Sequence, residues 1–372
     1  LSVTVLGHIF EQSISDLDDI RSKVAVAKSL DQVTLSKRKR DEIYYTPDYV
    51  VRAIVDATLG EYLRNLEQQI LRDSGLKSDI KDKTYASREQ DAYRQYQQAL
   101  QSVSVVDPAC GSGAFLVHVY DYLMSEHERV GAILGDLFSQ EEHVRSVLRN
   151  NIFGVDLNAE SVEITKLSLW LKSATKNEKL TSLDDNIKVG NSLVSDPAIA
   201  GRKAFDWHAS FPRVMESGGF EVIVGNPPYG AKVSKPELAY LQMHINNTVL
   251  GPSLSDTYIV FYVFCMGTLL RSGGKLGFIA PNTWCLTESA APFREYLLQG
   301  DFTVDAIVSH KEKVFEEATV DTNSVVVTKT RATTKTLVRT LTQRATETLH
   351  DNLILQSSLA SRDFVNTEMV EE

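Results

Sequence analysis

A strand, a glycine-rich turn and a helix follow one another without a break at residues 103–116. The run at residues 103–106 is mostly β-branched, as is typical of a strand, and it leads into Asp107. Gly111 and Gly113 come next, and because glycine has no side chain they let the backbone approach a ligand closely. A strand that enters a helix through such a turn is the βα unit of nucleotide-binding α/β folds. We therefore expect an α/β protein with a ligand at the carboxyl edge of its sheet.

The turn does not fit a dinucleotide-binding motif, because the third glycine of that motif would fall at Leu116. The next strand, residues 151–155, instead ends in Asp156, which can accept hydrogen bonds from ribose hydroxyls. Leu157 stands beside it to pack on a base. Asp156 could also cap the helix expected at residues 159–174, although Asn158 is the better cap. These residues indicate a nucleoside-type ligand.

The same design recurs after the strand at residues 187–189, which leads into Gly190 and Asn191. Asn191 could bond the edge of a base, but an asparagine in this position is more often a turn residue. Both interpretations stay open at this point. A buried helix is expected at residues 256–270, and three further strands at residues 275–282, 302–308 and 324–330, the last two as an antiparallel hairpin.

The tetrapeptide Asn226, Pro227, Pro228 and Tyr229 directly follows the apolar run at residues 220–225. The residue before a proline favours extended geometry, so Asn226 should project beyond the carboxyl edge of the sheet. Pro228 has no N–H, so the Pro227 carbonyl and the Asn226 side chain form a stiff pair of acceptors beside an aromatic ring. Such a pair suits a planar ring that carries an amino group, such as adenine. A stiff loop with a packed tyrosine explains the tetrapeptide alone equally well.

Composition limits the classes of function. A formal net charge of −10 argues against a chain that simply coats nucleic acid, although an enzyme could still grip DNA through a local patch. Three cysteines without paired metal-ligand spacing support neither a disulfide framework nor a metal site, which fits a reducing cytoplasm. The longest apolar run, residues 258–270, is too short to span a bilayer. The first residue is Leu1, so we expect a processed or excised chain.

The segments outside the strand-rich region are less informative. Residues 1–43 indicate helices followed by the basic run at residues 37–40, which is either a solvated loop or a phosphate contact. Thr46 and Pro47 begin a helix whose free N–H groups could hold a carboxylate. Residues 60–101 are rich in polar side chains and predict a solvated helical insertion. The extension at residues 331–372 predicts one strand and a tail.

Taken together, these motifs resemble the N6-adenine DNA methyltransferases of combined restriction-modification enzymes, the type IIG-like family that uses S-adenosylmethionine. The resemblance covers residues 7–330. It implies a Rossmann-like class I methyltransferase, α/β with a mostly parallel sheet and a C-terminal antiparallel hairpin, plus an N-terminal helical region. It assigns residues 44–330 to the methyltransferase domain and residues 331–372 to the start of a missing or truncated recognition region. The resemblance depends on residues 6–11, 44–47, 107–116, 154–158, 190–193, 226–229 and 273–281.

The resemblance also implies roles for individual residues. The methionine end of the cofactor would be surrounded by Thr46, Pro47, Asp107, Ala109, Gly111 and Gly113. Asp156 would bind the ribose, Leu157 would pack on the cofactor adenine, and Asn191 would bond its edge. Many relatives carry aspartate where Asn191 stands, but an amide can still accept, so we expect binding to survive.

For catalysis, the resemblance makes Asn226 and the Pro227 carbonyl acceptors for the two protons of a flipped adenine amino group. Tyr229 would stack on the flipped base and Phe315 would close its other face. The implied partner is double-stranded DNA, with separate or missing target-recognition and nuclease domains and no membrane.

Two other functions compete with this one. The same acceptors would fit RNA or the amide of a protein glutamine, and a methyltransferase-like module could bind DNA in a defence complex without turnover.

Overall fold

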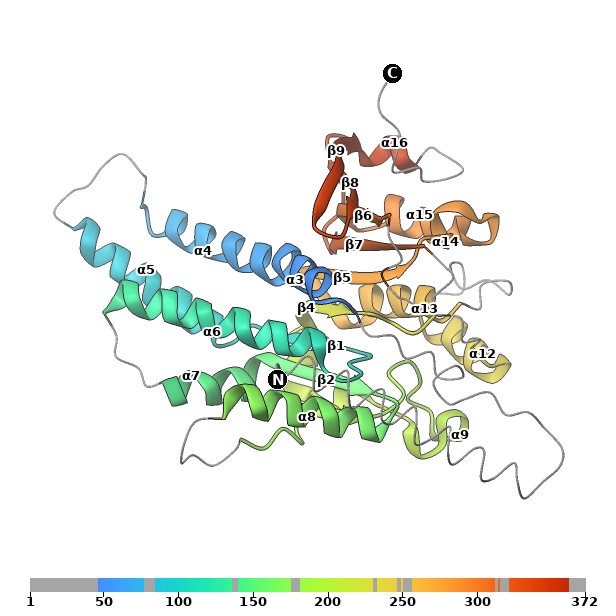
Figure 1. Cartoon of the computed structure of the whole chain (residues 1–372), viewed down its shortest axis with the longest axis horizontal. Coiled ribbons are helices and arrows are strands. Elements are labelled where there is room, and N and C mark those ends of the chain that lie inside the picture. Colours follow the sequence, from blue (N-terminus) through green and yellow to red (C-terminus); the bar gives the residue numbers. More distant parts are fainter. Residues whose placement is uncertain are drawn as a thin grey trace.

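The computed structural model describes residues 46–76, 84–135, 140–174, 181–229, 233–245, 249, 256–311, 314 and 321–360 (Figure 1). The helices predicted in residues 1–43, the basic run at residues 37–40 and the base-stacking residue Phe315 lie outside this part of the chain.

A single mixed sheet organises the fold, with the strand order β3-β2-β1-β4-β5-β7-β6-β8-β9. Neighbouring strands from β3 to β5 are parallel, β7 is antiparallel to both β5 and β6, and β9 is antiparallel to β8. The mostly parallel sheet with an antiparallel hairpin is therefore confirmed. The strands are β1 (Val105–Asp107), β2 (Ile152–Asp156), β3 (Ile187–Val189), β4 (Phe220–Gly225), β5 (Leu270–Pro281), β6 (Thr303–His310), β7 (Thr322–Thr328), β8 (Leu337–Arg344) and β9 (Glu347–Leu355).

Helices cover both faces of the sheet, as alternation along β5 shows. Adjacent residues of a strand point to opposite faces. A side chain at Gly277 would meet Ile54 and Thr58 of the N-terminal helical segment, whereas the next residue, Phe278, packs its ring 5.1 Å from Tyr262. In Figure 1, α3 to α6 accordingly lie on one side of the strands and α12 to α15 on the other.

The first helices of the chain are α3 (Asp48–Val55), α4 (Glu61–Asp73), α5 (Tyr85–Leu100), α6 (Ala114–Leu134), α7 (Gln140–Ser146) and α8 (Ala159–Ser173). Beyond them come α9 (Pro197–Ala200), α10 (Trp207–Ser210), α11 (Pro212–Glu216), α12 (Lys235–His244), α13 (Thr257–Phe264), α14 (Thr283–Leu286), α15 (Ala291–Gln299) and α16 (Gln356–Ala360). Three π-helical turns, η1 (Asp56–Gly60), η2 (Val147–Asn151) and η4 (Cys265–Leu269), and the 3₁₀ turns η3 (Gly201–Lys203) and η5 (Glu288–Ala290) complete the described elements.

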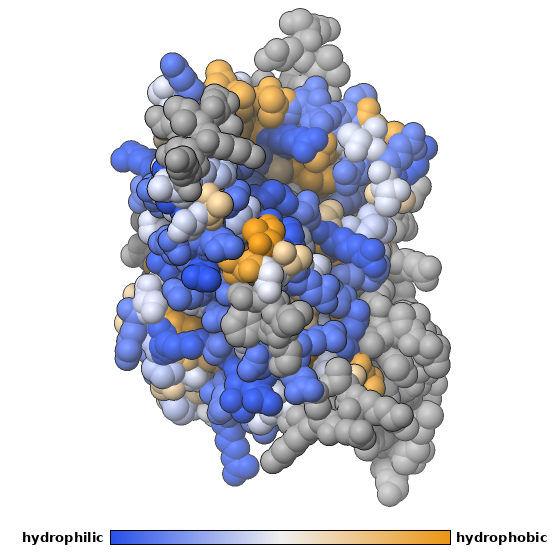
Figure 2. All heavy atoms as spheres, turned by 90° about the vertical axis from the view of Figure 1, so that its left-hand side faces the viewer, coloured by the Kyte–Doolittle hydropathy of each residue, from blue (hydrophilic) through white to orange (hydrophobic). Residues whose placement is uncertain are grey.

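Helices α4, α5 and α6 pack beside one another and extend away from the sheet (Figure 1). A small apolar cluster of its own holds them together, made of Ile70, Ala92, Tyr96 and Val130. Figure 2 looks at this end of the molecule and shows a mainly hydrophilic surface with a small apolar group near its centre. The predicted helical character of residues 60–101 thus agrees with α4 and α5.

The segment beyond Arg331 contains more structure than the one strand predicted. Strands β8 and β9 form a hairpin, and β8 pairs in parallel with β6, so the main sheet continues to residue 355. Val338 and Ile354 are buried in the main core, which explains why the hairpin packs there. Within the described residues, no helix combines the length and apolar character needed to cross a membrane.

Candidate active site

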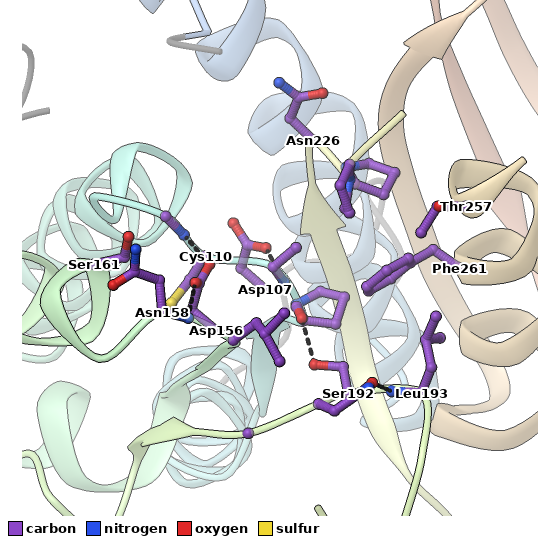
Figure 3. A pocket seen from close by; sticks show the side chains of 18 of the residues that line it. Asp107, Cys110, Asp156, Asn158, Ser161, Ser192, Leu193, Asn226, Thr257 and Phe261 are labelled. Carbon is purple, nitrogen blue, oxygen red and sulfur yellow. Dashed lines mark hydrogen bonds between the residues drawn. The ribbon is translucent and has the colours of Figure 1, made fainter. Parts of the chain in front are cut away.

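A cavity of about 620 Å³ opens at the carboxyl edge of the parallel strands (Figure 3). Its volume is in the range of small-molecule and cofactor sites. It brings together most of the residues singled out from the sequence: Thr46, Asp107, Ala109, Gly111, Asp156, Leu157, Asn191, Asn226, Pro227, Pro228 and Tyr229. Pro47 and Gly113 are not among the lining residues. Pro47 instead accepts the N–H groups of Val50 and Val51 through its carbonyl.

Gly113 supports the cavity from behind. It has φ +86°, and an added Cβ would lie 3.0 Å from the Thr165 side chain. The Thr165 hydroxyl donates to the Gly111 carbonyl at 2.7 Å, so the glycine turn is fixed against α8. A side chain at position 113 would therefore displace the turn as well as strain the backbone.

Asp107 lies at the end of β1 and is 1% exposed. One of its carboxylate oxygens accepts the Ala109 N–H at 3.0 Å. Burial is the main reason that the pKa of Asp107 is raised to about 8; the Ala109 N–H acts in the opposite direction and the nearby Asp156 adds to the rise. Gly225 of β4 passes so close that a Cβ there would lie 2.7 Å from an Asp107 oxygen. The carboxyl group is thus held at the floor of the cavity, largely protonated at neutral pH.

Asp156 links three parts of the cavity wall. Its side chain accepts the Gly111 N–H at 2.9 Å and the Asn158 N–H at 2.8 Å. Asn158 is the N-cap of α8, accepting the Glu160 N–H at 2.8 Å, so the predicted cap is confirmed. A carboxylate oxygen can accept more than one hydrogen bond, so these two bonds are compatible with Asp156 also accepting from a ligand hydroxyl. Leu157 beside it is 49% exposed, as expected for a residue that would cover an incoming ring.

Asn191 is at once a turn residue and a cavity residue. Its side-chain oxygen accepts the Leu193 N–H at 3.0 Å, which stabilises the turn after β3. Its amide nitrogen donates to Glu237 Oε1 at 3.4 Å. Gly190 is required just before it, because a Cβ at that position would lie 2.4 Å from the Phe205 ring.

Asn226 directly follows β4, whose last residue, Gly225, lies against Asp107 (Figure 3). Its amide nitrogen donates to the hydroxyl of Thr46 at 3.2 Å. Its side-chain oxygen is buried and accepts no hydrogen bond from any residue that the structure describes. Since Thr46 is itself buried and sits just ahead of α3, the amide is held from a distant part of the chain.

The tyrosine that follows the prolines is buried, at 4% exposure, and belongs to the main core. It also lines the cavity. The stiff loop with a packed tyrosine and the cavity wall are therefore one and the same feature.

Several cavity residues were not anticipated from the sequence. Thr257 and Phe261 face the cavity from α13 (Figure 3), while Val233, Glu237 and Leu241 approach from α12 and its start. The apolar run of α13 identifies a buried helix but not the face it turns to a ligand. The capping box of Ser234 and Glu237 is a sequence signal that could have located the start of α12.

A mostly parallel sheet in this order, with one antiparallel strand beside β5 and a cavity at its carboxyl edge, defines a class I methyltransferase fold. The sequence-based expectation of this fold is confirmed. Residues 150–315 match the family described as “Eco57I restriction-modification methylase”.

Two named proteins and one solved structure are also similar to this chain. The “Type II restriction enzyme and methyltransferase RM.Eco57I” of Escherichia coli is 23% identical over 345 residues, covering 86% of this chain and 31% of that protein. The “Adenine-specific methyltransferase PglX” of Lacticaseibacillus casei (strain Zhang) is 23% identical over 152 residues, covering 36% of this chain and 11% of that protein. The solved structure of the Type IIL restriction-modification enzyme MmeI in complex with DNA has a TM-score of 0.58 at 15% identity, covering 86% of this chain and 41% of that one. This chain therefore spans less than half the length of each of these proteins.

Proposed function

We propose that this chain is the methyltransferase part of a site-specific DNA adenine-N6 methyltransferase that uses S-adenosylmethionine, within a restriction-modification or phage-defence enzyme. Two similarities support the proposal: the Eco57I-type family match, and a relative that is named an adenine-specific methyltransferase. The arrangement of the site provides the chemical reason.

The single observation that carries the proposal is the buried oxygen of Asn226, which has no hydrogen-bond donor among the described residues. Leaving a buried acceptor unpaired costs about 1–3 kcal/mol, so most buried acceptors in native proteins have a hydrogen-bond donor. An acceptor without one in the protein is therefore a candidate for binding a donor of the ligand. The Thr46 hydroxyl engages the nitrogen of the same amide, which leaves the oxygen as the atom that faces a ligand. A ligand with an N–H donor, such as an exocyclic amino group, would satisfy it.

The residues around Asn226 fit transfer to such an amino group. The Pro227 carbonyl is stiffened by Pro228, which cannot donate a competing N–H. Asn226 and Pro227 would accept the two amino protons, which favours a pyramidal nitrogen with its lone pair free for in-line attack. Tyr229 would stack on the base that has left the duplex, and Phe315 would close its other face.

The remaining cavity residues fit the cofactor, which when bound supplies an activated methyl group. Asp156 would accept from ribose hydroxyls, Leu157 would cover the adenine, and Asn191 would lie at its edge. Asp107 lies beside the glycine turn, where Ala109 and Gly111 would approach the methionine end. An incoming ammonium group lowers the pKa of a neighbouring carboxyl, so Asp107 would release its proton on binding.

The test is methyl transfer by the full-length protein from labelled S-adenosylmethionine to plasmid DNA, RNA and protein in parallel. We expect label on DNA alone, and single-molecule sequencing of DNA from expressing cells should locate it on adenine N6. Asn226→Ala should abolish transfer while the affinity for S-adenosylhomocysteine changes less than about twofold. Label on RNA or protein would assign the site to another substrate. Absence of label on every substrate, with cofactor binding intact, would indicate a non-catalytic DNA-binding module.

A further inference from the structure

The end of the cavity opposite Asn226 carries a donor and an acceptor side by side. The donor is the amide nitrogen of Asn191, after β3, and the acceptor is Glu237 Oε1 on α12, 3.4 Å away. Both residues line the cavity. Glu237 is half-buried, so its carboxylate lies at the cavity wall without being removed from solvent.

Asn191 by itself can offer only its amino group to a ligand in this arrangement. Its oxygen is turned to the backbone, where it accepts the Leu193 N–H at 3.0 Å. Glu237 is oriented just as firmly, because its second oxygen accepts the Ser234 N–H at 3.0 Å and the Ser234 hydroxyl accepts the Glu237 N–H at 3.4 Å. The capping box at the start of α12 therefore aims Oε1 at Asn191 and the cavity.

This pair is complementary to one edge of adenine. That edge presents an amino group, which donates, next to a ring nitrogen, which accepts. Hypoxanthine presents the reverse, a carbonyl oxygen next to a ring N–H. A carboxylate only accepts, so with hypoxanthine it would face the carbonyl oxygen with no proton between them.

We propose that Glu237 determines specificity for the adenine ring of the cofactor by accepting its amino group, while the amide nitrogen of Asn191 donates to the adjacent ring nitrogen. The proposal rests on the proposed function, since it assigns this end of the cavity to the cofactor adenine. It places the purine selectivity of the site on α12, a helix outside the strand ends that hold the other predicted residues.

The informative variant is Glu237→Gln. Glutamine can fill the same place in a capping box, so α12 should keep its start. Its one side-chain oxygen would then accept the Ser234 N–H, as the second carboxylate oxygen of Glu237 does, so its amino group would face the ligand and could not accept from the adenine amino group. Glu216→Gln is a matched control, because Glu216 is an exposed residue of α11 that does not line the cavity.

The experiment is calorimetric titration of the full chain with S-adenosylhomocysteine and with S-inosylhomocysteine, its hypoxanthine counterpart. We expect the wild-type protein and Glu216→Gln to bind the adenosyl ligand at least about 30-fold more tightly than the inosyl ligand. In Glu237→Gln this ratio of the two affinities should fall about tenfold, because a charge-assisted hydrogen bond is removed. A merely structural role for Glu237 would weaken both ligands equally, and that result would overturn the proposal. So would a wild-type protein that binds both ligands equally well. If the wild-type protein binds neither ligand, the proposed function itself fails.

Discussion

Asp107→Asn should make the protein more stable at alkaline pH while it damages the site. Asparagine has nearly the shape of a protonated aspartic acid and can accept the Ala109 N–H in the same way. What it removes is the group that must ionise in a buried position. The pKa of Asp107 in the folded protein is about 8, compared with an ordinary value of 3.8.

The magnitude follows from proton linkage. The folded protein retains the Asp107 proton up to about pH 8, whereas the unfolded chain releases it near pH 3.8. The stabilising contribution of this group is therefore fully present below pH 3.8 and is lost as the pH rises to about 8. Between pH 5 and pH 8 the wild-type protein should lose about 3–4 kcal/mol relative to the variant, at 1.36 kcal/mol per pKa unit.

The assay is urea unfolding of the wild-type protein and of Asp107→Asn at several pH values between 5 and 8, followed by circular dichroism. The difference in unfolding free energy should grow with pH in favour of the variant. Asp185→Asn, at an exposed position, controls for the loss of one carboxylate and should show no such trend. A difference between wild type and Asp107→Asn that stays constant from pH 5 to pH 8 would refute the reasoning, because Asp107 would then ionise alike in both states.

Two further predictions concern the substrate end of the cavity. Thr46→Val keeps the shape of the side chain but removes the hydroxyl that accepts from the Asn226 amide at 3.2 Å, so kcat should fall about fivefold, corresponding to one hydrogen bond, with little change in KM for the cofactor. Thr46→Ser keeps the hydroxyl and should retain nearly the wild-type kcat, whereas a loss in Thr46→Ser as large as that in Thr46→Val would contradict this role of the hydroxyl. Tyr229→Ala and Phe315→Ala should each weaken binding to DNA with an extrahelical adenine by about 1–3 kcal/mol, measured by fluorescence anisotropy. Unchanged binding for Phe315→Ala would show that Phe315 does not contact the base.

Most of the site could be predicted because its functional residues stand at the ends of parallel strands, and each strand is recognisable in the local sequence. Asp107, Asp156 and Asn226 each terminate or directly follow an apolar run, and the carboxyl ends of parallel strands meet at one edge. Local sequence thus fixes both the strand and the position of its last side chain. Asn191 was ambiguous for the same local reason, because a turn asparagine and a ligand-binding asparagine have the same neighbours.

What could not be predicted depends on contacts between distant segments. The bond from Asn226 to Thr46 joins residues 180 positions apart, and nothing in either segment specifies it. Glu237 has a recognisable capping role, but only the packing of α12 brings it to Asn191. The β8–β9 hairpin was underestimated because Leu337, Leu353 and Leu355 are exposed, which weakens the alternation that marks a strand.

The two ends of the cavity use different acceptors for what we propose is the same chemical group, and the difference has a physical cause. Asn226 directly follows Gly225, which packs against the buried Asp107 carboxyl. A second carboxylate at position 226 would raise the pKa values of the pair further, so one of them would be protonated and lost as an acceptor. A neutral amide avoids this repulsion. Glu237 lies on α12 and is half-buried, and the charge of a carboxylate there strengthens binding of an amino group that does not react. The neutral acceptor is thus placed where chemistry would occur, and the charged one where only recognition is needed.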